Sequence, residues 1–253
     1  MLDVDPVNRE ALSDQVADRL LGYIISKGLE SGTRLPSEQK LADEFGVSRP
    51  VVREALRSLA GQRIIQIVNG KGAVVNPLNG YLLGVFFQRA VKLDEQLIYD
   101  FMEVRQWLEI QMARQAAVRR TKADLDILGD LVAKMQGLEG DTGEYVKLDV
   151  EFHIAIARAA RNVILFHIVA SMRKALPQVI SAVFSGQPSP EALRAFLQRS
   201  RSQHAAIHDA IVRQDGGGAE RAMSIHLADA YESISQRVDM GAGKEERAVR
   251  SIV

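Results

Sequence analysis

Apolar residues recur with the spacing of an α-helix along almost the whole chain after residue 90. Alternating β-branched runs are scarce, and aromatic residues make up only 6% of the sequence. The exception is a pair of short β-type runs, residues 64–68 and 73–75, which flank the turn Asn69-Gly70-Lys71-Gly72. The pattern therefore predicts a mainly α protein with one β-hairpin.

The residues before this hairpin have the pattern of three short helices. The first is expected over about residues 13–27. The second would begin at the capping residue Ser37 and end at Gly46, and the third would run from Ser48 to about Gly61. Two short helices joined through a glycine turn, followed by a hairpin, indicate a winged helix-turn-helix.

Clusters of helix-breaking residues divide the rest of the chain. Residues 77–80 follow the hairpin as a short linker and separate a domain of residues 1–76 from a second domain of residues 81–240. A length of 253 residues also fits two domains. We expect the second domain to be an all-α helical bundle and residues 241–253 to be a disordered tail. The six or seven helices of the second domain are expected at about 80–90, 94–119, 122–138, 142–160, 163–184, 190–214 and 218–239, with breaks at Gly140, Pro188 and residues 216–218.

Composition excludes several classes of protein. The chain has no cysteine, so disulfides, cysteine-bound metals and thiol nucleophiles are ruled out. It carries 32 Lys and Arg against 32 Asp and Glu, so contact with nucleic acid would need a local basic patch. No apolar run approaches the roughly 18 residues of a membrane span, and the N-terminus lacks a signal-peptide pattern. We therefore expect a soluble, cytoplasmic protein without a membrane partner.

The third predicted helix carries such a patch. Arg49, Arg53 and Arg57 are spaced four apart, opposite the apolar stripe of that helix. Residues 49–71 contain five cations and only one anion, Glu54, which gives a local charge of +4. Guanidinium groups suit phosphates and guanine edges in the major groove of DNA. The alternative is a solvated helix face on which Arg57 pairs with Glu54.

The first 76 residues resemble a known family in the motifs Leu35-Pro36-Ser37-Glu38, Gly46-Val47-Ser48-Arg49 and Val52-Arg53-Glu54-Ala55-Leu56, together with the wing turn. These motifs are similar to the N-terminal domain of GntR-family bacterial transcription regulators over about residues 10–76. The chain departs from the family at Gln39, where arginine is usual, and at Pro50, where a small hydroxyl residue is common. Taken with the basic patch, the resemblance implies that DNA is contacted by Ser48, Arg49, Arg53, Arg57, Asn69, Gly70 and Lys71, with Asn69 and Gly70 reaching the minor groove.

Polar residues also lie on apolar helix faces of the second domain. Asp149 and His153 are four apart and project from one face, while His204 and His226 each lie on the apolar stripe of a later helix. Polar groups in such places need partners. Three imidazoles and a carboxylate that converge in a bundle would bind a divalent transition metal. The alternative is a solvated Asp–His pair and two hydrogen-bonded core histidines.

A second resemblance covers about residues 90–238. The segments 148–153, 160–162, 204–211 and 223–227 look like the FCD effector domain of the FadR subfamily. In the metal-binding branch of that subfamily, the matching residues are metal ligands, which implies a site made by Asp149, His153, His204 and His226. The expected ion is Zn²⁺, with Ni²⁺ or Mn²⁺ as alternatives. His208 would lie on the helix surface or behind the ligands, and His167 matches no motif.

Two further residues are candidate contacts for an effector. Arg105 lies on the apolar stripe of its helix, where an unpaired cation is costly, so it needs an anion nearby. The resemblance suggests a carboxylate effector bound to the metal, and the alternative is a helical pair with Glu109. Asn162 would contact the effector or cap the next helix.

The residues thus favour a ligand-responsive transcription regulator that is not an enzyme. It would bind a palindromic operator as a homodimer and sense a small carboxylate. The alternative is a zinc-dependent hydrolase with an accessory DNA-binding module. That hydrolase lacks an obvious base, because Glu151 lies about 200° around the helix from Asp149 and no H-E-x-x-H motif is present. An acyl-CoA sensor like the subfamily's namesake is disfavoured, since that branch lacks the metal ligands.

Overall fold

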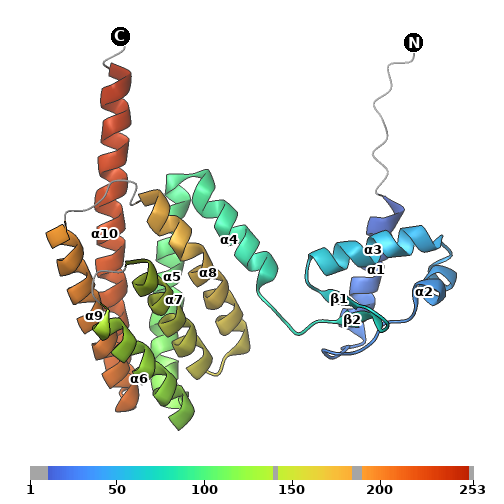
Figure 1. Ribbon diagram of the computed structural model, residues 1–253, viewed down its shortest axis with the longest axis horizontal. Helices are drawn as coiled ribbons and strands as arrows, with labels where there is room; N and C mark the ends of the chain where they lie inside the picture. The colour runs from blue at the N-terminus through green and yellow to red at the C-terminus, as the bar shows by residue number, and fades with distance from the viewer. Residues whose placement is uncertain (1–10, 139–141, 184–189, 251–253) are drawn as a thin grey trace. The chain divides into compact units, whose positions relative to one another are not determined.

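The chain divides into two compact units, Met1–Tyr81 and Leu82–Val253. The computed structural model describes residues 11–138, 142–183 and 190–250 (Figure 1). The expected helix breaks at Gly140 and Pro188 lie outside these residues. Within them, the prediction of a mainly α protein with an N-terminal winged helix-turn-helix and a C-terminal helical domain is confirmed.

The N-terminal unit consists of three helices followed by a two-stranded antiparallel sheet. Ile65 pairs with Val75 and Val68 with Gly72, so the strands form the expected hairpin. Val52 and Leu56 of the third helix pack with Leu20 of the first in a buried core. The elements are α1 (Leu12–Ser26), α2 (Glu38–Phe45), α3 (Arg49–Gly61), β1 (Ile65–Val68) and β2 (Gly72–Val75).

The turn between α2 and α3 follows from its capping residues. The Ser37 hydroxyl accepts a hydrogen bond from the Lys40 amide at 3.2 Å, which caps the start of α2. Gly46 ends α2 with a φ of 67°, a conformation that glycine adopts without a steric penalty. Ser48 occupies the N-cap position of α3, as expected, but its side chain makes no capping hydrogen bond.

The described part of the C-terminal unit is all helical. Its helices are α4 (Tyr81–Leu93), α5 (Glu95–Arg119), α6 (Lys122–Gly137), α7 (Thr142–Ala159), α8 (Val163–Val183), α9 (Pro190–Val212) and α10 (Gly216–Arg250). Helix α10 ends at Arg250 and so includes residues 241–250 of the segment expected to be a tail. That segment is rich in Ala, Glu, Lys and Arg, whose strong helix propensity outweighs the roughly 1 kcal/mol cost of each glycine.

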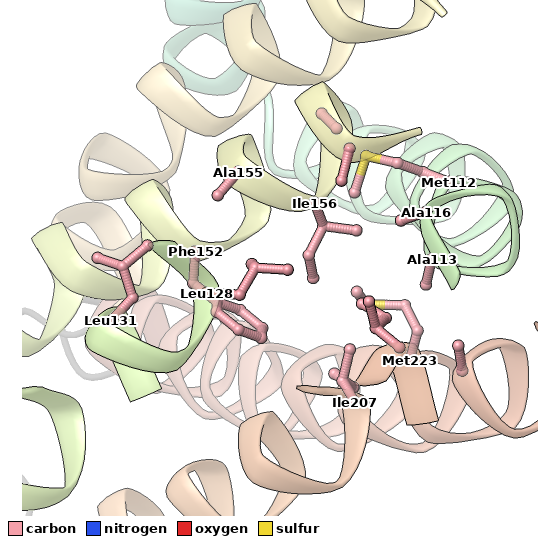
Figure 2. Packing of buried hydrophobic residues seen from close by; sticks show 14 of the residues in the cluster. Met112, Ala113, Ala116, Leu128, Leu131, Phe152, Ala155, Ile156, Ile207 and Met223 are labelled. Atoms are coloured by element: carbon pink, nitrogen blue, oxygen red, sulfur yellow. The ribbon is translucent and has the colours of Figure 1, made fainter. Parts of the chain in front are cut away.

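Helix α5 packs against α7, α8, α9 and α10. One hydrophobic cluster gathers residues such as Met112, Phe152 and Ile207, and Figure 2 shows their side chains directed toward one another. A second cluster includes Met102 from α5 and Met172 from α8. The stretch of α5 between the two clusters carries buried charged residues, and these belong to the site described below.

Candidate functional site

The arginines of α3 point outward from the N-terminal unit, as predicted. The side chains of Arg49, Arg53 and Arg57 are 56%, 46% and 62% exposed. Arg57 Nη1 donates to Glu54 Oε1 at 2.6 Å, so the pairing considered as an alternative does form. It leaves the guanidinium on the surface.

Glu38 of α2 is a residue of this face that sequence reasoning missed. Its carboxylate accepts hydrogen bonds from Arg53 Nε and Nη2, and the shortest is 2.9 Å. Arg49 Nη2 lies 3.8 Å from the same carboxylate. Glu38 and Arg53 are 15 residues apart on different helices, so no helical spacing could have indicated the pair.

The turn between β1 and β2 forms an exposed tip made by Asn69, Gly70 and Lys71. Gly70 has a φ of 74°, which favours glycine, and the Lys71 amide donates to the Val68 carbonyl at 3.0 Å. The guanidinium of Arg63, another cation of the basic patch, lies 4.5 Å from the centre of the Tyr81 ring.

In the C-terminal unit, the four predicted metal ligands come together. Asp149 and His153 lie on α7, His204 on α9 and His226 on α10, and one ligand atom from each lies within 4.8 Å of the others. His153 Nε2 is 3.3 Å from His226 Nε2, and His204 Nε2 is 3.1 Å from Asp149 Oδ1. Three ring nitrogens and one carboxylate oxygen therefore face a common point.

The opposite ring nitrogens are held by a second set of residues. His153 Nδ1 lies 2.7 Å from Glu109 Oε2, His204 Nδ1 3.2 Å from the Tyr145 hydroxyl, and His226 Nδ1 3.0 Å from Gln203 Oε1. The Tyr145 hydroxyl itself donates to Ser200 Oγ at 2.7 Å, so it accepts from the ring. Glu109, the Tyr145 hydroxyl and Gln203 each favour a hydrogen on the Nδ1 that they face, which leaves the corresponding Nε2 with a free lone pair. At His153 the donor Nη2 of Arg173 also contacts Nδ1 and acts in the opposite direction.

One buried nitrogen of the cluster gives a further indication of metal binding. His204 Nε2 is buried and makes no hydrogen bond of good geometry, although Asp149 Oδ1 lies 3.1 Å away. A buried polar atom without a well-formed hydrogen bond is costly, and a metal ion would satisfy it. Three imidazoles and one carboxylate are ligands that suit Zn²⁺ and similar ions. The residues present therefore fit a divalent transition metal.

Burial keeps two of these imidazoles neutral. It lowers the pKa of His153 to about 4, with the charge of Arg173 acting in the same direction, and it holds the pKa of His226 well below its usual value. Burial alone would raise the pKa of Asp149, but His204 and Arg173 outweigh it and hold that pKa well below its usual range. Neutral imidazole and ionised carboxylate are the forms that bind metals.

Arg173 of α8 is the main residue of this site that the sequence did not reveal. Its fully buried guanidinium donates to Glu109 Oε2 and to Asp149 Oδ2, the latter at 3.1 Å, and it also contacts His153. Arg105 is buried as well and donates to Glu109 Oε1 at 3.0 Å, which is the helical pair considered as an alternative. The positive charges of Arg105 and Arg173 balance the negative charges of Glu109 and Asp149. A bound divalent ion would therefore leave this region with a net charge of about +2.

Two parts of the chain match known domain families. Residues 12–75 match the bacterial regulatory proteins of the gntR family, and residues 100–229 match the FCD domain. The chain belongs to the GntR family of transcription regulators. Its pairing of a GntR domain with an FCD domain is that of the FadR-like subfamily. GntR-family regulators bind DNA, and the FCD domain is their effector-binding part.

Three similar proteins extend over most of this GntR-family chain. The HTH-type transcriptional regulator LutR of Bacillus subtilis is 31% identical over 212 residues, 82% of this chain and 94% of that protein. The putative L-lactate dehydrogenase operon regulatory protein of Escherichia coli is 30% identical over 252 residues, 94% of this chain and 92% of that protein. The solved structure of a Streptococcus agalactiae GntR protein is 26% identical, with a TM-score of 0.64, and covers 87% of this chain and 99% of that one.

The alternative of a hydrolase is not supported, because the family and the similar proteins are transcription regulators and not enzymes. Glu151, the carboxylate nearest in sequence to the ligands of α7, is exposed.

Among the described residues, no helix combines the length and the apolar character needed to cross a membrane.

The remaining candidates lie away from the ligand cluster of this regulator. Asn162 is exposed, and its Oδ1 accepts a hydrogen bond from the Leu165 amide at 3.0 Å. It therefore caps α8, which is the second of the two roles considered for it. His208 is on α9, where its Nδ1 lies 3.6 Å from the Asp209 carboxylate. His167 contacts the ring of Phe166. His208 and His167 are outside the four-residue cluster, in line with the roles expected for them.

Proposed function

We propose that this regulator binds a palindromic DNA operator as a homodimer. The exposed arginines of α3 and the wing tip support this, because a winged helix-turn-helix uses these elements to reach the DNA grooves. One such unit contacts only a few base pairs, and two copies related by a two-fold axis double the sequence that is read. The proposed DNA contacts are Ser48, Arg49, Arg53, Arg57, Asn69, Gly70 and Lys71. Because it acts on the chromosome, we place the protein in the cytoplasm.

The FCD domain holds one divalent ion in this proposal, and Zn²⁺ is the first choice. The observation that carries the proposal is the convergence of three imidazole nitrogens and one carboxylate oxygen, one of which, His204 Nε2, is buried and makes no hydrogen bond of good geometry. Ni²⁺ and Mn²⁺ accept the same ligand types. When bound, the ion supplies open coordination positions for an oxygen ligand.

The effector is a small carboxylate, such as a hydroxy acid. Buried positive charge on Arg105 and Arg173 supports an anionic guest, since a divalent ion would leave the site with excess positive charge. One of the similar proteins is named for an L-lactate dehydrogenase operon, and L-lactate is a hydroxy acid. An effector that prefers one arrangement of the DNA-binding domains would change operator affinity, typically by about 5–150-fold. Asn162 is the weaker effector contact, because its side-chain oxygen caps α8.

The metal site is tested by two single substitutions on the same helix. His204→Ala removes a proposed ligand, and His208→Ala removes an imidazole four residues away that lies outside the cluster. We expect about one metal ion per chain in the wild type and in His208→Ala, and much less in His204→Ala, by plasma mass spectrometry of purified protein. An unchanged metal content in His204→Ala would refute the assignment.

A further inference from the structure

We propose that Glu38 is a positioning residue for sequence recognition, which orients Arg53, and more weakly Arg49, toward the DNA bases. This inference rests on the proposed DNA contacts of these arginines. Glu38 belongs to a motif of the matched domain but is not among the residues proposed to contact DNA, and a carboxylate would itself be repelled by phosphates. Its role is to hold a guanidinium that lies on another helix.

The geometry of the pair leaves one edge of the arginine available. Arg53 Nε lies 3.3 Å from both Glu38 oxygens, and Nη2 lies 2.9 Å from Oε2. This contact uses the Nε side of the guanidinium and leaves the N–H groups of Nη1 and the outer N–H of Nη2 for another acceptor. Those groups are the ones that can bind O6 and N7 of guanine as a fork. A fixed guanidinium also loses less conformational entropy when it binds a base.

Glu38 is itself held in place by the fold. It is the first residue of α2, directly after the capping residue Ser37. Leu41 and Ala42 of α2 are buried in one cluster with Val52 of α3, so the packing of the two helices fixes the distance between carboxylate and guanidinium. The hydrogen bond from Arg53 lowers the pKa of Glu38, which keeps the carboxylate ionised at neutral pH.

Two roles for Glu38 predict different changes in the preference for the operator when its charge is removed. If Glu38 were only an anion on the DNA-binding face, its loss would strengthen binding to every duplex, because protein–phosphate attraction would rise. If it positions Arg53, its loss gives the arginine many conformations. Binding to unrelated DNA then rises or stays the same, while the preference for the operator falls.

The experiment compares the full-length wild type with Glu38→Ala and Glu38→Gln. The probe is a duplex that the wild type enriches from a randomised library, and its partner is a scrambled duplex of the same length. Fluorescence anisotropy titrations give the ratio of the two affinities. Glu44→Ala is the control, because Glu44 is another α2 carboxylate, is exposed, and lies 3.9 Å from Lys40. The melting temperature of each variant shows whether it is folded, and Glu38→Gln keeps the side-chain volume.

We expect both Glu38 variants to lower the affinity ratio by about tenfold, the scale of one base-specific arginine contact, and Glu44→Ala to leave it within about twofold of the wild type. In an Arg53→Ala background, the effect of Glu38→Ala on the ratio should shrink. A folded Glu38 variant with an unchanged ratio, or an undiminished effect without Arg53, would overturn the inference. If Arg53→Ala by itself left the ratio unchanged, the proposed base contact of Arg53 would fail instead.

Discussion

Arg105 and Glu109 form an ion pair inside the C-terminal unit, with Nε and Oε1 at 3.0 Å and side chains that are 2% and 0% exposed. The other oxygen of Glu109 meets His153 Nδ1 at 2.7 Å and also contacts Arg173. One carboxylate therefore links the proposed effector arginine to a proposed metal ligand. An anion that draws Arg105 away from Glu109 would alter the surroundings of that ligand directly.

We predict that Arg105→Ala abolishes the response of DNA binding to a carboxylate effector. Glu109 keeps Arg173 and His153 as partners in this variant, so the bundle should fold and bind its operator without effector at near wild-type affinity. The measurement is a gel-shift titration with small organic acids, chosen because they raise the melting temperature of the wild type. Chelation of the metal should have the same effect. An acid that still released DNA from metal-free protein would show that the effector binds elsewhere.

Tyr145→Phe is predicted to weaken metal binding by about 10–100-fold, the usual effect of losing a partner that orients a ligand. The variant loses the hydroxyl that faces His204 Nδ1 at 3.2 Å and donates to Ser200. Competition with a coloured chelator measures the affinity. Tyr231→Phe, which removes a tyrosine hydroxyl from α10, is the control and should behave as the wild type does. Equal metal affinities in the two variants would argue against the orienting role of Tyr145.

The sequence made the four residues candidates because they are polar groups on helix faces, and the resemblance to the FCD domain then favoured metal ligands over hydrogen-bonded histidines. Asp149 and His153 share a helix face at a spacing of four, and His204 and His226 interrupt apolar stripes. All four lie together in the structure. Arg105 was found in the same way, and its ion pair with Glu109 was one of the two pairings considered for it.

Partners on separate helices could not be found by the same reasoning. Arg173 is 64 residues from Glu109 and 24 from Asp149, so no periodicity relates them. A single arginine in a helical pattern is usually a solvated residue, since long charged side chains reach water easily. Glu38 escaped notice because it stands in a helix-start motif, where an acidic residue already has a local explanation.

Asp124→Asn is predicted to destabilise the protein at neutral pH by about 0.5–2 kcal/mol, because Asp124 is the N3 residue of the capping box that starts α6 and its charge pairs with Arg161. Burial alone would raise the pKa of Asp124, but hydrogen bonds from the Thr121 amide and hydroxyl and the charge of Arg161 outweigh it, so the pKa is lowered. A carboxylate whose pKa is lowered by folding stabilises the fold at any pH above its pKa in the unfolded state, which is about 3.9. This stabilisation is lost as the pH falls through the lowered pKa of the folded state.

The difference in unfolding free energy between wild type and Asp124→Asn should therefore narrow below about pH 4. Urea unfolding at a series of pH values measures it, with the exposed Asp126→Asn on the same helix as control. A difference that stayed constant down to acidic pH would mean that the charge of Asp124 contributes nothing.

Lys71→Ala is predicted to weaken DNA binding equally for all sequences. Lys71 is exposed at the wing tip, and a lysine that neutralises one phosphate contributes about one unit to the slope of log affinity against log salt concentration. The slope should thus fall by about one for each protomer, while the ratio of operator to scrambled affinity stays the same. Arg53→Ala should lower that ratio, because guanine recognition depends on sequence. Lys134→Ala removes a cation from α6 of the effector domain and should leave the slope unchanged. If the slope were also unchanged in Lys71→Ala, the wing would make no ionic contact with DNA through this residue.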